Sequence, residues 1–185
     1  MLKKIILFIR KSILDIDDRS QLEIAIANGL KIGHSCNIMG ECIIDPGHCF
    51  LIEIGNKVTL APRVHLLAHD ASTKRELNYT IIRKIVIGNN VFIGAGSIIL
   101  PGVRIGNNVI IGAGSVVSHD ITENSVAVGN PARIIETYQE YMKKRKIQMR
   151  NSRVFDESYT IENITEEKKK DMKDYLSDKN IGFII

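Results

Sequence analysis

The sequence predicts an all-β solenoid, a parallel β-helix of hexapeptide repeats with helices at both ends. Three observations predict this fold. Apolar residues return every six positions from Ile85 to Val117, glycine follows most of them, and the pattern persists for more than thirty residues. An α-helix repeats at about 3.6 residues and a single strand at about 2, so strict sixes match the hexapeptide class of β-helix repeats.

The repeat has two inward phases. The first contains Ile87, Ile93, Ile99, Ile105, Ile111 and Val117, and the second, two residues earlier, contains Ile85, Val91, Ser97, Val103, Val109 and Ser115. Each hexapeptide is expected to form one flat side, and three of them, about eighteen residues, close a triangular coil. Glycine is expected at the corners, where the backbone must turn tightly.

The chain is expected to have three regions: a helical cap at residues 1–29, the β-helix at residues 30–134 with a protruding loop at about 67–84, and a helical extension at residues 135–185. In the cap, residues 3–14 are predicted to form one helix. Ser20 is predicted to be the N-cap of a second helix that ends at Gly29. Both helices would cover the open end of the coil, which otherwise exposes apolar side chains.

The first residues do not favour a signal peptide or a membrane span. Their apolar run is short and is broken by Arg10 and Lys11, and no small-residue cleavage site follows. Peripheral membrane contact is kept only as a minor alternative.

The repeat loses phase at three places. The spacing is ten residues from Ile44 to Ile54 and twenty-one from Leu66 to Ile87, and a further slip covers Ser118 to Asn124. Loops on a rigid scaffold carry much of protein function, so these breaks are the first places to look for chemistry.

The C-terminal region is predicted to be mostly helical. Residues 135–148 are predicted to form a helix with a charged face, and Thr165 to be the N-cap of another. Residues 181–185 are apolar and are expected to dock onto the β-helix or a neighbouring subunit.

Composition limits the partners and the compartment. The formal net charge of +4 suits an anionic ligand but is too small to favour nucleic acid. The chain has three cysteines, an odd number, so a disulfide framework is not expected and a cytoplasmic location is favoured. Cys36 and Cys42 are spaced like inward residues of the early repeats and are interpreted as core residues.

At this point the repeats and the stretch GAGSVVSHDITENSVAVGNPARII resemble the hexapeptide-repeat acyltransferase family. Within it they are most similar to the maltose, galactoside and capsular or lipopolysaccharide O-acetyltransferases. The resemblance implies a left-handed parallel β-helix, a homotrimer with active sites between subunits, and acetyl-CoA as the acyl donor. The left hand comes from the resemblance alone, because general chirality rules favour right-handed crossovers.

Acyl transfer to a hydroxyl group needs a base, for which imidazole is the usual choice. The five histidines are His34, His48, His65, His69 and His119. By resemblance the base is His69, where the chain leaves the coil, and Asp70 either orients its ring or serves only as a turn residue. Asp45 and His48 resemble a segment of serine acetyltransferases, and they either orient the substrate, support another residue of the site, or form a structural turn. His34 and His65 are interpreted as structural.

The same resemblance implies a coenzyme groove along the coils. Ala95, with Gly96 beside it, would offer its backbone N–H to the thioester carbonyl, and Ala113 would contact the pantetheine. Ser118 and His119 match positions near the adenosine, and Pro131 and Arg133 lie in the segment that meets the ribose phosphate. Glu136 stands where some relatives have arginine, so phosphate binding is expected to be weaker or to use Lys143, Lys144 or Arg145.

The function predicted from these residues is transfer of an acetyl group from acetyl-CoA to a sugar hydroxyl in surface polysaccharide synthesis, by direct attack and without a metal. Three alternatives stay open. They are an amino-sugar N-acetyltransferase, a zinc enzyme resembling γ-type carbonic anhydrases through His65 and His69 with His48 of a neighbouring subunit, and an inactive trimeric binding protein.

Overall fold

The computed structural model describes residues 20–177 and 180–185 of the chain. The chain divides into two compact units, residues up to Glu136 and residues Thr137–Ile185, and each is described by itself. The helix predicted for residues 3–14 lies outside the described residues.

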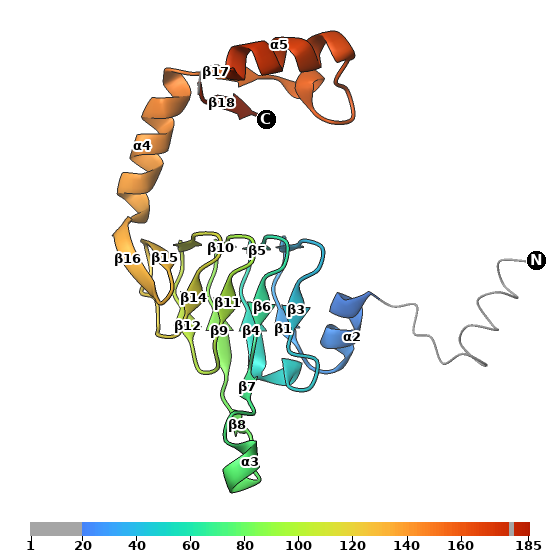
Figure 1. The fold of residues 1–185 in the computed structure, drawn as a ribbon, viewed down its shortest axis with the longest axis vertical. Helices are drawn as coiled ribbons and strands as arrows, with labels where there is room; N and C mark the ends of the chain where they lie inside the picture. Colours follow the sequence, from blue (N-terminus) through green and yellow to red (C-terminus); the bar gives the residue numbers. More distant parts are fainter. Residues whose placement is uncertain (1–19, 178–179) are drawn as a thin grey trace, which may run out of the picture. The chain divides into compact units, whose positions relative to one another are not determined.

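The larger unit is built from three sheets that the chain visits in rotation (Figure 1). The first sheet contains β1 (Lys31–Ile32), β4 (Ile52–Ile54), β9 (Ile85–Ile87) and β12 (Arg104–Ile105). The second contains β2 (Asn37–Ile38), β5 (Thr59–Leu60), β10 (Phe92–Ile93), β13 (Ile110–Ile111), β15 (Ser125–Gly129) and β16 (Ala132–Thr137). The third contains β3 (Ile43–Ile44), β6 (His65–Leu66), β11 (Ile98–Ile99) and β14 (Val116–Val117). Three successive strands therefore complete one coil.

The strands stack in parallel with equivalent residues in register. Ile93 pairs with Leu60 on one side and with Ile111 on the other, and the third sheet repeats this with Leu66, Ile99 and Val117. Every residue of the two inward phases from 85 to 117 is at most 2% exposed, which confirms the predicted core. Burial of each such isoleucine stabilises the fold by about 1.5–3 kcal/mol.

The first coil is less completely buried than the others. Ile32, Ile38 and Ile44 are partly exposed because they lie at the end of the stack. Cys42 and Cys49 are buried, as predicted for Cys42, and Cys36 is half-buried.

The corner glycines have two roles, the predicted one in turns of positive φ and a second one in stacking. Gly88 does not adopt positive φ, and a Cβ there would lie 2.9 Å from the backbone of Gly106 in the next coil. The positive φ values occur two residues further on, at Asn90 (φ 55°) and at Gly96 (φ 68°). Glycines that directly follow an inward isoleucine, such as Gly88 and Gly94, are thus required for close stacking of the coils, and the next residues make the turn.

The Ser20 N-cap is confirmed. Helix α2 (Gln21–Ala27) begins with a capping box, in which the Ser20 hydroxyl accepts from Glu23 N–H and the Glu23 carboxylate accepts from Ser20 N–H. The chain leaves the helix at Asn28 and Gly29, which has φ of 100°.

The two early phase breaks form separate excursions from the coil. The first contains the short helix η1 (Cys49–Leu51). The second contains β7 (His69–Asp70), α3 (Lys74–Leu77) and β8 (Ile81–Ile82), with β7 and β8 paired antiparallel in a protruding hairpin (Figure 1).

The C-terminal unit contains α4 (Tyr138–Arg150), β17 (Arg153–Phe155), η2 (Glu157–Tyr159), α5 (Glu166–Leu176) and β18 (Gly182–Ile184). The helix predicted for residues 135–148 begins later, because residues 135–137 extend β16 and Thr137 forms a capping box with Glu140. The Thr165 N-cap is confirmed by its bond from Lys168 N–H.

The apolar residues near the C-terminus pair with another strand of the same unit. Strand β18 pairs in parallel with β17, so the unit itself supplies the contact that was expected from the β-helix or a neighbouring subunit. Phe155 is 2% exposed at the centre, and Arg153 forms a two-pronged ion pair with Asp171 above it. Within the described part of the chain, no helix has the length and apolar character to cross a membrane.

Candidate active site

The three corners of the coil carry different side chains, and we name them accordingly. The Asn corner, between the first and second sheets, contains Asn56, Asn89 and Asn107. The Ala corner, between the second and third sheets, contains Ala95, Gly96, Ala113 and Gly114. The His corner, between the third and first sheets, contains Asp45, His48, His69, Ser118 and His119.

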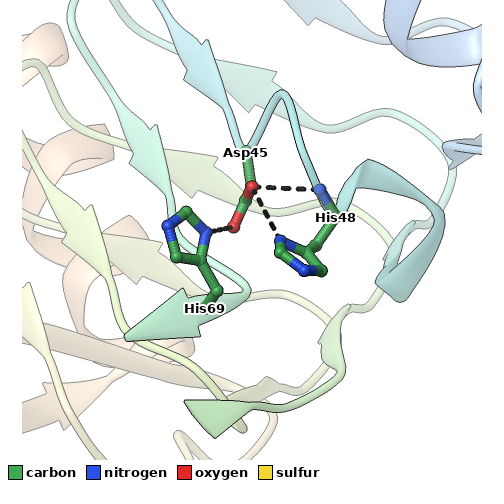
Figure 2. Close-up of side chains that lie close together, drawn as sticks. All are labelled: Asp45, His48 and His69. Carbon is green, nitrogen blue, oxygen red and sulfur yellow. Dashed lines mark hydrogen bonds and ion pairs between the residues drawn. The ribbon is translucent and has the colours of Figure 1, made fainter. Parts of the chain in front are cut away.

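The His corner brings together Asp45, His48 and His69 (Figure 2). Asp45 follows β3 and His69 opens the β7–β8 hairpin, twenty-four residues later. His69 Nδ1 lies 2.5 Å from Asp45 Oδ2. Because a carboxylate can only accept, Nδ1 is the donor in this bond, and Nε2 is the ring nitrogen left for another partner. The His69 side chain is 38% exposed, so that nitrogen can reach a bound molecule.

Asp45 is fully buried and its carboxylate is saturated with donors. Oδ1 accepts from Gly47 N–H and His48 N–H, both at 3.1 Å, and Oδ2 accepts from Ala68 N–H at 2.9 Å as well as from His69. Burial opposes ionisation, but the bonds from His69, Ala68 and Gly47 outweigh it, so the pKa of Asp45 lies below its ordinary value. Asp45 is therefore a fixed anion that orients His69.

Asp70, which was predicted as one possible partner of the His69 ring, is the second residue of β7, and its side chain bonds to the turn that follows. Its carboxylate accepts from Ser72 N–H at 2.8 Å, and it is exposed. The ring partner is Asp45, more distant in sequence. The sequence did contain a signal for Asp45. It directly follows the inward Ile44, at the first break in the repeat, where a side chain can still be buried against the coil.

His48 approaches the same carboxylate from the other side. Its Nδ1 lies 3.6 Å from Asp45 Oδ1, and its ring centre is 5.0 Å from that of His69. This nitrogen is buried and has no hydrogen-bond partner among the described residues. The two imidazoles therefore flank one carboxylate.

Asp45, His48 and His69 also form the group of described residues that could hold a metal ion, with their ligand atoms within 4.8 Å of one another. A metal would have to replace the His69 bond, because every acceptor position of Asp45 is already used. His65, the third histidine of the zinc alternative, lies outside this group, on the outward face of β6. Within one chain, the Asp45 carboxylate is therefore already used to hold His69.

The Ala corner presents free backbone donors. In the described ranges, the N–H groups of Ala95 and Ala113 have no hydrogen-bond acceptor, and both residues are exposed. A shallow cavity of about 550 Å³ lies against this corner and is lined by Gly40, Glu41, Pro62, Arg63, Ala95 and Gly96. An acceptor atom of a ligand could therefore bind there without displacing an internal bond.

Two buried serines support the Ala corner from inside the coil. Ser97 and Ser115 occupy inward positions, and both hydroxyls donate to Gly112 O, at 3.0 and 2.7 Å. Ser115 Oγ also accepts from Gly129 N–H at 3.1 Å. The sequence signal for this support is serine in a phase otherwise filled by valine and isoleucine, although no role was predicted for it.

The remaining cofactor candidates divide between the two corners. Pro131 follows Gly129 and Asn130, one coil beyond Ala113, and Arg133 is exposed on β16 with its guanidinium on Ala132 O at 3.1 Å. Ser118 and His119 follow β14 and hydrogen-bond to each other at 2.9 Å. Ser118 and His119 therefore lie where strands of the third sheet end, whereas Ala95 and Ala113 lie where these strands begin.

The third sheet separates the base from the free donors within one chain. His69 follows a strand of this sheet, whereas Ala95 precedes one. One side of the coil is about six residues, roughly 15–20 Å of extended chain. Ala95 and His69 of one chain therefore lie at opposite ends of one side of the coil.

Comparison with known proteins shows similarity to hexapeptide-repeat transferases. The family model described as bacterial transferase hexapeptide (six repeats) matches residues 84–119. Protein CapG of Staphylococcus aureus is 44% identical over 121 residues, which cover 63% of this chain and 70% of CapG. The galactoside O-acetyltransferase of Lactococcus lactis is 40% identical over 116 residues, which cover 60% of this chain and 51% of that protein.

Among solved structures, a maltose O-acetyltransferase from Clostridium difficile 630 is similar, with a TM-score of 0.53 and 42% identity. The match covers 59% of each chain. The chain thus spans most of CapG but only about half of the galactoside enzyme.

Proposed function

The chain belongs to the family of bacterial hexapeptide-repeat transferases, and we propose that it transfers an acetyl group from acetyl-CoA to a hydroxyl group of a sugar. The observation that carries the proposal is the Asp45–His69 pair, a buried carboxylate that orients an imidazole whose second nitrogen is free. The names of the galactoside and maltose O-acetyltransferases support both the reaction and the acceptor class.

His69 acts as the general base. Its Nε2 takes the proton of the acceptor hydroxyl as the hydroxyl oxygen attacks the thioester carbonyl. The new C–O bond forms a tetrahedral oxyanion, which collapses as the C–S bond breaks. The departing thiolate takes the proton back from His69, so protons balance. Asp45 stabilises the intermediate imidazolium and keeps the ring in place.

The Ala corner binds the donor. The free N–H of Ala95, next to Gly96, holds the thioester carbonyl and stabilises the developing oxyanion, and that of Ala113 binds the pantetheine arm. Small side chains let the arm lie close to the backbone. Gly94 contributes by keeping the coils close, because a Cβ there would fall against the backbone of Ala113.

The active site lies between subunits of a homotrimer with left-handed coils. This assembly is supported by the placement of His69 and Ala95 on different corners, because a three-fold axis can bring the His corner of one subunit to the Ala corner of the next. Ser118 and His119 then approach the adenosine from the subunit that supplies His69. Arg133, after Pro131, pairs with the ribose phosphate, as guanidinium groups do well.

We place the enzyme in the cytoplasm and in the synthesis of a surface polysaccharide. Cys36, Cys42 and Cys49 are free thiols, which fits a reducing compartment. The similarity to CapG supports a relation to capsule formation only through that protein's name.

The proposal is tested by incubating the protein with acetyl-CoA and a panel of methyl glycosides and oligosaccharides, with thiol release and product mass as readouts. Wild-type protein should release one CoA per acetylated sugar. His69→Ala should lower kcat by about 10²–10⁴-fold, the usual contribution of a general base. His34→Ala, at the Asn corner, is the matched control and should retain activity, because the ring of His34 bonds to Ser35 and its backbone N–H, which alanine keeps, donates to Asn56 Oδ1.

The same assay separates the alternatives. Transfer to amino sugars but not to hydroxyl groups would indicate an N-acetyltransferase. Stoichiometric zinc with carbon dioxide hydration and no thioester turnover would replace the proposal by the zinc enzyme. Binding of acetyl-CoA without turnover on any acceptor would indicate an inactive binding protein.

A further inference from the structure

One turn position of the Ala corner changes its residue type between the second and third coils. This position lies two residues before each strand of the third sheet and has positive φ in four successive coils. Gly96 and Gly114 occupy it in the third and fourth coils, both with φ of 68°. Glu41 and Arg63 occupy it in the first and second coils, with φ of 63° and 61°. Two long charged side chains therefore stand where the backbone favours glycine.

The two glycines leave the surface of the corner open. A Cβ on Gly96 or Gly114 would meet no atom within 4 Å. The neighbouring N–H groups of Ala95 and Ala113 have no acceptor among the described residues. This open stretch suits the pantetheine arm of the proposed function, and it ends at the second coil, where the side chain of Arg63 is exposed on the same corner.

Arg63 and Glu41 form an ion pair beside Ala95. Arg63 Nε donates to Glu41 Oε2 at 2.7 Å, and both side chains are exposed. Both residues line the cavity of about 550 Å³ that Ala95 also lines. A molecule that approaches a thioester held at Ala95 from the side away from the arm therefore meets this ion pair.

The proposed base belongs to the same coil as Arg63. Arg63 precedes β6 and His69 follows it, so both residues lie at one level along the stack of coils. Where the three-fold axis of the proposed trimer runs along the stack, it keeps residues of one coil at one level. The ion pair of one subunit and the base of the next can then contact the same acceptor.

The ion pair offers both donors and an acceptor to a bound molecule. Arg63 uses Nε for Glu41, and across the described part of the chain its two Nη groups and Glu41 Oε1 have no partner. A sugar hydroxyl group can accept from the guanidinium and donate to the carboxylate. The pair is neutral as a whole, so a carboxylate that Arg63 attracts is repelled by Glu41.

We propose that Arg63 and Glu41 bind the acceptor next to the position that is acetylated, and that the acceptor is an uncharged sugar rather than a uronic acid. This inference rests on the proposed function and adds the acceptor class to it. Arg63 and Glu41 determine specificity, and His69 remains the base.

The test measures kcat/KM for matched neutral and acidic acceptors, namely methyl glucopyranoside against methyl glucuronopyranoside and the two galactose counterparts, with saturating acetyl-CoA. Wild-type protein should prefer the neutral sugar. Glu41→Gln leaves the Arg63 charge unopposed and should shift the neutral-to-acidic ratio about tenfold toward the acid, the value of one hydrogen bond to a charged group. Arg63→Gln leaves the Glu41 carboxylate unopposed and should shift the ratio in the opposite direction.

The KM for acetyl-CoA should stay unchanged in both variants, because the open stretch beside Ala113 is intact. Lys31→Ala is the matched control. It removes an exposed ion pair to Glu53 at 2.9 Å, which also joins the first coil to the second across 22 positions but lies on the first sheet. This variant should leave both the ratio and the KM for acetyl-CoA as in wild type.

A ratio that is the same in wild type, Glu41→Gln and Arg63→Gln would overturn the inference while the acetyltransferase function stands. A wild-type preference for the uronic acid would overturn it as well. A higher KM for acetyl-CoA with an unchanged ratio would assign the pair to the donor site instead. Absence of transfer to every acceptor would overturn the function and, with it, this inference.

Discussion

The Asn corner and the Ala corner begin with the same isoleucine–glycine pair, but they differ in whether the next backbone N–H has a hydrogen-bond acceptor. At the Asn corner, Asn56 N–H donates to Asn89 Oδ1 at 2.8 Å, and Asn89 N–H donates to Asn107 Oδ1 at 2.7 Å. At the Ala corner, the corresponding groups of Ala95 and Ala113 have no acceptor within the parts of the chain that the structure describes. At one corner the backbone donors are paired with side chains of the next coil, and at the other corner the described donors are unpaired.

This difference shows how one repeat can serve both stability and binding. The coil geometry is nearly the same at the two corners, so the side chain after the glycine decides whether the donor is used internally. The asparagine side-chain oxygen accepts a hydrogen bond from the backbone N–H of the neighbouring coil, whereas the alanine side chain has no acceptor.

The strongest test of the comparison removes a donor from the open corner. Pro62 occupies the position equivalent to Ala95 one coil earlier, as the bond from Gly96 N–H to Pro62 O indicates, so proline is compatible with this backbone. Ala95→Pro should lower kcat by about 10²-fold, the usual effect of losing one oxyanion donor. The free energy of unfolding, measured by urea denaturation, should change little. Activity close to wild type would exclude this N–H from the reaction.

A subunit-mixing experiment tests whether the open corner and the His corner meet between chains. His69→Ala and Ala95→Pro are each nearly inactive, but a mixed trimer can join an intact His corner to an intact Ala corner. After co-refolding in equal amounts, random three-fold assembly should restore about one quarter of the wild-type sites. If the site were contained in one chain, mixing would restore no activity.

Asp45→Asn tests the support of the His corner. The amide has one acceptor oxygen, and its NH₂ group would face backbone donors that now bind the carboxylate. The variant should lose about tenfold or more in kcat and about 2 kcal/mol in the free energy of unfolding. Asp70→Asn is the matched control and should be close to wild type in both measurements, since Asp70 is exposed and its carboxylate bonds to Ser72 rather than to His69. The opposite ranking would make Asp70 the orienting group.

Asn107→Ala tests the closed corner. It removes the oxygen that accepts from Asn89 N–H at 2.7 Å and from Asn89 Nδ2 at 3.2 Å. The free energy of unfolding should fall by about 1–2 kcal/mol, while kcat and KM for acetyl-CoA stay unchanged. A loss of activity with unchanged stability would show that the Asn corner also takes part in binding.

The smallest effect is expected in the pH dependence of stability. Because the pKa of Asp45 is lowered in the folded protein, its stabilising contribution is present above the ordinary aspartate pKa of about 3.9 and is lost as pH falls through the folded value. Unfolding free energies of wild type and Asp45→Asn should therefore differ by a constant amount near neutral pH and converge at acid pH. A difference that grows on acidification would contradict the lowered pKa.

Much of the β-helix could be predicted from the sequence because its information is local and periodic. The two phases that include Ile87 and Ile85 identify the inward residues without any knowledge of distant contacts. Ser20 and Thr165 are recognised as helix N-caps from the residues that directly follow them. By contrast, the start of α4 was misplaced because Ile134 and Ile135 suit a helix as well as the added strand β16.

The sequence by itself determined the repeat, the inward core and the positions at which the chain must leave the coil. Only the tertiary structure decided that Asp45 rather than Asp70 holds His69, that His48 shares this carboxylate, and that Ala95 lies across a sheet from the base. The physical reason is that a period fixes the direction of side chains inside the coil. The period contains no information on where the side chains of a loop that leaves the coil lie relative to other residues.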